Sequence, residues 1–247
     1  MEAYALTDVG QKRSMNQDSV YARTKSIGSL ENLFIVADGM GGHQAGDFAS
    51  NFVVENLVRF FETPYPERDV HGILKEGIRK VNRDLYECTS RDPKLNGAGS
   101  TLVLATIKGS VLYVANIGDS RLYLLREALE QITKDHSYVE ELVAMGKLKR
   151  GSRDYLEKKN IITRAVGVSA QVDTDLFALK LKSGDQILMC SDGLSNMVDE
   201  LEIEYIIRSE DGVESRAKAL VDAANRSGGL DNISVVLVEP QISEVSL

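Results

Sequence analysis

Five aspartates in this sequence stand beside small residues at the expected ends of apolar runs. They are Asp38 in FIVADG, Asp192 in ILMCSDG, Asp119 in YVANIGDS, Asp231 in GGLDNISVVLV and Asp18 in NQDSV. Each alone is more simply explained as a turn residue, because Asp tolerates turn geometry and Gly supplies a positive φ. Strand ends are rigid, however, so carboxylates placed there can converge at a fixed separation. The five together therefore favour a shared site.

Converging carboxylates repel one another and need a cation between them. No cysteine or histidine cluster at ligand spacing occurs, so oxygen ligands for Mg²⁺ or Mn²⁺ are expected. The glycines that follow Asp38 have no Cβ, so the backbone can approach an ion and the Gly39 carbonyl can itself be a ligand. A carboxylate between two ions about 3.5–4 Å apart can bridge them and help to hold an activated water. Such a site suits hydrolysis of a phosphate ester.

Short strands and a few helices must position these carboxylates. Nine runs are typical of strands: EAYALTD, SVYAR, LFIVAD, TLVLATI, SVLYVAN, SRLYLLR, DLFALKL, DQILMCS and NISVVLVE. Helical spacing of apolar residues predicts helices over Ala45 to Glu62 and Val70 to Cys88, and more weakly over Ser137 to Lys147, Glu200 to Ile207 and Val213 to Asn225. This order predicts an α+β fold in which helices cover antiparallel sheets.

The chain shows no internal repeat, low-complexity tract or linker-like stretch. We therefore expect residues 1–247 to form a single domain. The region from about 135 to 173 is the least strand-like, and it contains the polar, basic run KLKRGSRDYLEKK. We expect this region to be a mobile flap beside the sheets.

Composition excludes several classes of protein. The 247 residues are 43% hydrophobic and 27% charged, with a net charge of -8, an ordinary globular mixture whose acidity argues against nucleic-acid binding. No apolar run is long enough to span a membrane, and the first residues do not resemble a signal peptide. We expect a soluble cytoplasmic protein.

Two other kinds of site find no support in the motifs. Neither Cys88 nor Cys190 is followed by Arg at the spacing of cysteine-based phosphatases, so both are interpreted as small apolar fillers. The glycines of DGMGGHQAG complete no nucleotide-binding motif.

The sequence resembles the type 2C metal-dependent protein serine/threonine phosphatases, in their compact bacterial form. The resemblance runs nearly end to end, through TDVGQKRSMNQDS, VADGMGGHQAGDFAS, GAGSTLVLATI, VANIGDSRLYLLR, TKDHSYVEELVAMG, NIITRAVG, MCSDGLSNMV and GGLDNISVVLV. It implies a sandwich of two antiparallel β-sheets with helices on both outer faces, a four-layer αββα arrangement.

The resemblance also assigns roles to the aspartates. It implies that Asp38 bridges two ions and that Asp192 and Asp231 complete the first metal. The Gly39 carbonyl would belong to the second metal, with a contribution from Asp18. Many relatives have Glu directly before the aspartate that corresponds to Asp18, whereas this chain has Gln17. The negative charge of this N-terminal motif therefore comes from Asp18 alone.

Three further residues take their roles from the same resemblance. Asp119 would join Asp192 in a third, weaker metal site, and Arg13 would bind the substrate phosphate. His43 is a candidate general acid. It lies three residues later than the corresponding histidine of animal relatives, where this chain has Met40, and capping of the following helix is an equally good explanation for it.

The expected function is hydrolysis of phosphoserine and phosphothreonine in proteins. A metal-bridging water would attack phosphorus without forming a phosphoenzyme. The implied cofactors are two core Mn²⁺ or Mg²⁺ ions and a weaker third. The implied partners are phosphorylated proteins, including a cognate Ser/Thr kinase, and a monomer is expected. The alternative is a phosphatase-like regulatory domain that binds partners without catalysis, but the metal-binding aspartates, whose loss would mark it, are all present.

Overall fold

The computed structural model describes residues 1–42, 45–64, 69–209 and 211–242. Its strands are β1 Glu2–Asp8, β2 Asp18–Arg23, β3 Leu33–Met40, β4 Gly99–Ser100, β5 Leu102–Lys108, β6 Val111–Ile117, β7 Arg121–Leu125, β8 Leu129–Gln131, β9 Asp175–Lys180, β10 Gln186–Cys190 and β11 Ile233–Glu239. Its helices are α1 Ala45–Glu62, α2 Val70–Arg91, α3 Tyr138–Ala144, α4 Arg153–Lys158, α5 Asp192–Ser195, α6 Glu200–Ile207 and α7 Val213–Arg226.

The strands form two antiparallel sheets that pack face to face. One sheet has the order β1-β11-β10-β7-β8, and the other has the order β2-β3-β5-β6-β9, with β4 paired to β3. Apolar side chains from both sheets, such as Phe34, Val103, Met189 and Val236, form the buried layer between them. Alternation along each strand places the remaining apolar residues on the outer faces.

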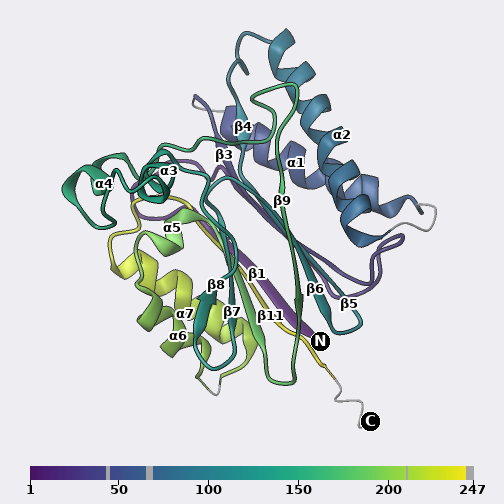
Figure 1. The fold of residues 1–247 in the computed structure, drawn as a ribbon, viewed down its shortest axis with the longest axis vertical. Coiled ribbons are helices and arrows are strands. Elements are labelled where there is room, and N and C mark those ends of the chain that lie inside the picture. Colours follow the sequence, from purple (N-terminus) through teal and green to yellow (C-terminus); the bar gives the residue numbers. More distant parts are fainter. Residues whose placement is uncertain (43–44, 65–68, 210, 243–247) are drawn as a thin grey trace.

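Helices bury those outer faces. In α1 and α2 the apolar residues recur at helical spacing, so Val53, Leu57 and Leu74 pack with residues of β3 and β5 in one cluster. On the other sheet, α6 and α7 bury Ile203 and Leu220 against residues of β10 and β11. Figure 1 shows the two helix pairs on opposite sides of the sheets. This confirms the predicted four-layer α+β sandwich.

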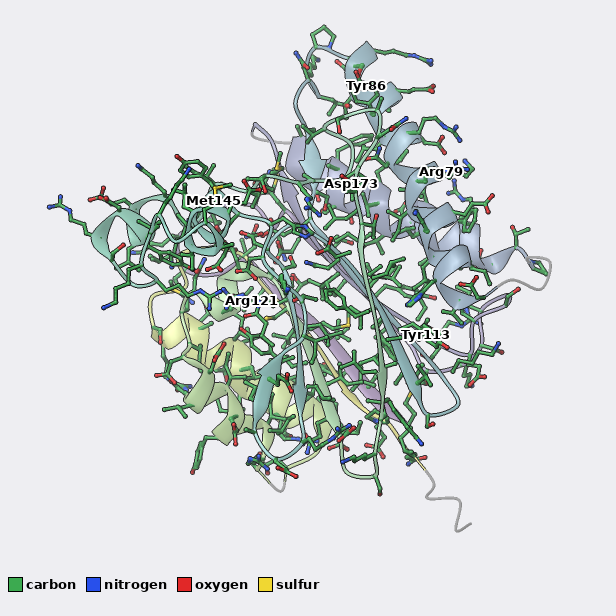
Figure 2. The ribbon with its side chains drawn as sticks, in the orientation of Figure 1. Arg79, Tyr86, Tyr113, Arg121, Met145 and Asp173 are labelled. Carbon is green, nitrogen blue, oxygen red and sulfur yellow. The ribbon has the colours of Figure 1, made fainter. Side chains whose placement is uncertain are left out.

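Most of the region from 135 to 173 lies outside these layers, although its Val166 pairs with Ser100 and is buried in the same cluster as residues of α1 and α2. It contains the short helices α3 and α4, which project from one end of the sandwich, while the start of β1 and the end of β11 lie toward the other end (Figure 1). Met145, just after α3, is 63% exposed and marks this projection in Figure 2. No helix in the described residues is long and apolar enough to cross a membrane.

Candidate active site

The register of the sheets gathers the predicted aspartates at one edge. In the antiparallel pair β2–β3, Asp18 lies directly opposite Asp38. In the antiparallel pair β10–β11, Asp192 follows the end of β10 and Asp231 precedes the start of β11, so both stand at the same end. Asp119 follows β6, which pairs with β5 next to β3. Residues far apart in the chain therefore meet through strand pairing.

A cleft of about 290 Å³ opens where these strand ends meet. The predicted residues among those that line it are Arg13, Asp38, Gly39, Asp119, Asp192 and Asp231. Two other predicted residues are not among them. Asp18 is buried beside the cleft, and His43 lies outside the described residues.

Asp18 contacts the residue that precedes Asp192. Its Oδ2 accepts a hydrogen bond from the Ser191 hydroxyl at 2.7 Å, whereas its Oδ1 is buried with no hydrogen-bond partner. Only 6% of Asp18 is exposed. Asp18 is therefore placed to influence the cleft through charge and through Ser191, from behind the lining residues.

Two glycines allow the backbones around the cleft to approach closely. A Cβ on Gly39 would stand 2.0 Å from the carbonyl oxygen of Gly46, at the start of α1. A Cβ on Gly193 would stand 1.8 Å from the carbonyl oxygen of Asn232. Such separations are far inside van der Waals contact, so only glycine permits Asp38 and Asp192 to occupy these positions.

Hydrogen bonds from neighbouring side chains hold the backbone around the cleft. Thr101 Oγ1 accepts from the amide of Asp38 at 2.9 Å, and the Thr101 amide donates to the Asp38 carbonyl at 2.8 Å. The amide group of Asn232 donates to the carbonyls of Val9 and Met15 and accepts from the amide of Gln17. Asn232 therefore fixes the N-terminal loop that presents Arg13.

Arg13 already pairs with one of the aspartates. Its Nη2 donates to Asp231 Oδ2 at 2.8 Å, and half of the Arg13 side chain is exposed to solvent. One end of the guanidinium thus meets the carboxylate cluster. Its remaining N–H groups are available to an anion in the cleft.

Burial and mutual repulsion hold three of these carboxyl groups toward their protonated form. Burial raises the pKa of Asp18 to about 7 and that of Asp119 to about 7, with further contributions from Asp192 and other carboxylates. Burial and the charge of Asp231 raise the pKa of Asp192 to about 6, against the opposing charges of Lys159 and Arg13.

Asp38 stands at the centre of this repulsion. Its pKa is raised well above its usual value, first by burial and then by the negative charges of Asp18, Asp192, Asp119 and Asp231. Five carboxyl groups thus share one region in which Arg13 is the cation among the lining residues. Such a cluster calls for added positive charge.

The donor set fits a divalent metal. The lining carboxylates are hard oxygen donors, and two buried oxygens, Asp18 Oδ1 and Asp192 Oδ1, lack any hydrogen-bond partner. Within the described residues, no three His, Cys, Asp or Glu side chains are yet drawn together tightly enough to hold an ion. The carboxylates surround a common space, and closing on an ion would relieve their repulsion and satisfy the unpartnered oxygens.

Several residues at the cleft escaped the sequence analysis. Thr101, Asn160 and Ile162 line it, and the last two come from the segment after α4. Thr101 is the first residue of the predicted strand TLVLATI and lies in the stretch GAGSTLVLATI that carries the resemblance, so these two signals could have suggested it. Asn160 and Ile162 belong to NIITRAVG, one of the stretches that carry the resemblance, but no chemistry of their side chains pointed to the cleft.

The chain is similar to known phosphatases along nearly its whole length. The family model "Protein phosphatase 2C" matches residues 10–223. Protein phosphatase PhpP of Streptococcus pneumoniae is 40% identical over 96% of this chain and 97% of that protein. Serine/threonine phosphatase stp of Listeria monocytogenes is 38% identical over 99% of this chain and 98% of that protein.

A solved structure supports both fold and metal chemistry. The catalytic domain of the serine/threonine protein phosphatase PstP, solved with two manganese ions, superposes with a TM-score of 0.82 and 36% identity. The match covers 96% of each chain. These relatives favour catalysis over a non-catalytic regulatory domain. The chain therefore belongs to the protein phosphatase 2C family, and it is a metal-dependent protein serine/threonine phosphatase of the bacterial type.

Proposed function

We propose that Asp38, Asp192 and Asp231 hold the core metal ions, with Asp38 shared between two of them. The observation that supports this most directly is the lining of one cleft by these three carboxylates, where Asp38 is the most strongly repelled. The Gly39 carbonyl would serve the second ion, and Asp18 would add charge from behind. When bound, Mn²⁺ or Mg²⁺ would lower the pKa of a water and neutralise charge on the phosphoryl group.

Titration of Mn²⁺ into metal-free protein tests this ligand set. Wild-type protein should bind two ions tightly, whereas Asp192→Asn and Asp231→Asn proteins should each lose at least one of them. Two-site binding that is unchanged in both variants would remove these residues from the metal centre.

The reaction that we propose is direct hydrolysis of phosphoserine and phosphothreonine. Arg13 binds the phosphoryl oxygens with the N–H groups that do not face Asp231, and it orients the phosphorus toward the carboxylates. No cysteine lines the cleft among the described residues, so a phosphocysteine intermediate has no support. The leaving oxygen takes its proton from His43 or from water.

Replacing Arg13 should mainly weaken substrate binding. Loss of a charge-assisted, bidentate contact at a half-exposed site costs about 2 kcal/mol, which corresponds to a KM roughly 30-fold higher for a phosphopeptide. Arg13→Ala should show this higher KM with a smaller effect on kcat. The KM of Arg13→Lys should lie between those of wild type and Arg13→Ala, because lysine keeps the charge but cannot make the bidentate contact. Steady-state kinetics in saturating Mn²⁺ measure it. Unchanged kinetics would assign Arg13 to the surface.

We propose that Asp119 and Asp192 hold a third and weaker ion. Two carboxylates are few ligands, and Mg²⁺ keeps several waters where carboxylates are scarce. Asp119 lines the main cleft and also a second cavity of about 190 Å³ beside it, so an ion there would lie toward the edge of the site. It would therefore be the first ion to leave on dilution.

Asp119→Ala should separate this role from that of a turn residue. We expect the two tight ions to remain bound in calorimetry and phosphopeptide turnover to fall by on the order of tenfold. The melting temperature of the metal-free protein should be kept or raised, because burial and Asp192 now oppose ionisation of this carboxyl group. Normal turnover together with a lowered melting temperature would assign Asp119 to the turn before β7.

We further propose the setting in which this activity operates. The phosphatases to which the chain is similar suggest phosphorylated proteins as substrates, and a cognate Ser/Thr kinase with its targets would supply them. Two free cysteines, Cys88 and Cys190, suit a reducing compartment such as the cytoplasm. We expect a monomeric, single-domain enzyme in which residues 135–173 act as a flap, because Asn160 and Ile162 of that region line the cleft.

A further inference from the structure

Helix α4 is held weakly to the rest of the molecule. It has six residues and no buried side chain, and its Leu156 is 57% exposed. Its Tyr155 donates a hydrogen bond to Glu140 of α3, which also accepts from Arg150 in the loop before α4. The position of α4 relative to the rest of the protein therefore depends on few contacts.

One side-chain hydrogen bond links this helix region to the body of the protein. Among the described residues, the hydrogen bonds of the side chains from 145 to 160 stay within the α3–α4 region, except that of Lys159. Lys159 Nζ donates to Asn196 Oδ1 at 2.8 Å. Asn196 caps the C-terminal end of α5, the short helix that begins with Asp192.

Asn196 passes this contact on to the metal-site aspartate. Its Nδ2 donates to Asp192 Oδ2 at 3.0 Å, while its Oδ1 accepts from Lys159. An ammonium group can only donate and a carboxylate can only accept, so the two contacts together fix the orientation of the amide. The contact also occupies one oxygen of Asp192 and leaves the buried Oδ1 without a protein partner.

We propose that Lys159 is a positioning residue. Through its hydrogen bond to Asn196, it couples the position of α4 to the orientation of the Asp192 carboxylate. The inference rests on the proposed function, in which Asp192 is a metal ligand. When α4 is in the position that the structure shows, Asp192 presents its unpartnered Oδ1 to an ion. When α4 moves away, Asn196 loses one of the two hydrogen bonds that orient it, and Asp192 no longer has a partner of fixed orientation.

Helix α4 and the body of the protein both contribute to the cavity beside the main cleft. It is lined by Tyr155, Leu156 and Lys159 from the α4 side and by Asp119, Asp192 and Asn196 from the body. Residues of α4 and of its C-terminal end thus form one wall of a cavity whose opposite wall carries two acidic side chains. Metal binding and the position of α4 are then coupled, and such coupling is reciprocal. An ion that orders Asp192 should therefore also stabilise α4 in the position that the structure shows.

Lys159→Met tests the coupling, and Lys158→Met is the matched control. Lys158 is the neighbouring exposed lysine of α4, and the structure records no hydrogen bond from its side chain. Two measurements are made on each purified protein: amide hydrogen exchange of residues 153–161 without metal and with Mn²⁺, and calorimetric titration of Mn²⁺. Lys159→Arg, which keeps a charged donor, serves as the rescue variant.

We expect Lys159→Met to speed exchange of residues 153–161 by about tenfold, as loss of a charge-assisted hydrogen bond implies, and to weaken Mn²⁺ binding by about tenfold. Mn²⁺ should slow exchange of this segment in wild type and in Lys158→Met but not in Lys159→Met. Lys159→Arg should regain most of both effects.

Two results would overturn the coupling. One is unchanged exchange in Lys159→Met, and the other is faster exchange with unchanged Mn²⁺ binding. Asp192→Asn distinguishes failure of this inference from failure of the proposed function. If that variant binds Mn²⁺ normally, the ligand assignment itself is wrong. If it loses an ion while Lys159→Met keeps normal affinity, only the coupling is wrong.

Discussion

Asp38→Asn should remove nearly all phosphatase activity and at the same time stabilise the metal-free fold. Shared metal ions contribute several kcal/mol of transition-state stabilisation, so loss of their common ligand should lower kcat/KM by at least about 10³-fold. Asn keeps the shape of the side chain, and the hydrogen bonds that Thr101 makes go to the backbone of residue 38. The fold should therefore survive the change.

The stability gain follows from the charges around Asp38. Its carboxyl group is buried and is repelled by Asp18, Asp192, Asp119 and Asp231, so a neutral amide is easier to bury there. Phosphopeptide turnover in Mn²⁺ and melting in EDTA measure the two effects. Asp173→Asn is the control, because Asp173 is exposed on the stretch that leads into β9 (Figure 2). A variant of Asp38 that is inactive only because it melts early would contradict the assignment.

Much of the fold was predictable because its elements carry strong local patterns. The predicted helices over Ala45 to Glu62 and Glu200 to Ile207 coincide with α1 and α6, and each of the nine predicted strands overlaps a strand of the structure. These segments alternate or repeat their apolar residues for several residues, and each has a partner that buries them.

The elements that the sequence analysis missed are short ones. Strands β4 and β8 and helices α4 and α5 each have at most six residues. Such lengths hold too few residues to show a period, and their structure depends on contacts with distant parts of the chain. Asp192 illustrates this: it was expected simply at a strand end, whereas it also begins the helix α5 that brings Asn196 beside it.

In the site, too, some features could be predicted from the local sequence and others could not. Clustering of the aspartates could be inferred because strand ends next to glycine have few conformations, and the register of Asp18 with Asp38 bears out their proximity. The position of Asp18 behind the lining residues could not be inferred, since it depends on Ser191, 173 residues away in the chain. Equally, nothing in the local sequence joins Lys159 to Asn196.

Metal removal should make the stability of this protein fall as the pH rises from about 4 to about 7. In the folded state the pKa of Asp18 and of Asp119 is raised to about 7 and that of Asp192 to about 6, from an ordinary value of 3.8, mainly by burial. Between the ordinary and the raised values the folded protein therefore binds more protons than the unfolded chain. Raising the pH removes these protons, so the free energy of unfolding decreases through this window.

Mn²⁺ should reverse this dependence, because an ion neutralises the same carboxylates without a proton. In EDTA we expect the melting temperature to drop by at least about 5 °C between pH 5 and pH 8, given about 2–4 °C per kcal/mol for a chain of this size. At 100 times its dissociation constant, each bound Mn²⁺ should restore about 2.7 kcal/mol at pH 8. At pH 5 the gain should be smaller, since protons compete for the ligands. Asp38→Asn should flatten the profile in EDTA and reduce the response to Mn²⁺. A melting temperature that rises with pH in EDTA would show that these carboxyl groups are ionised and satisfied without metal, which would contradict the cluster as a metal centre.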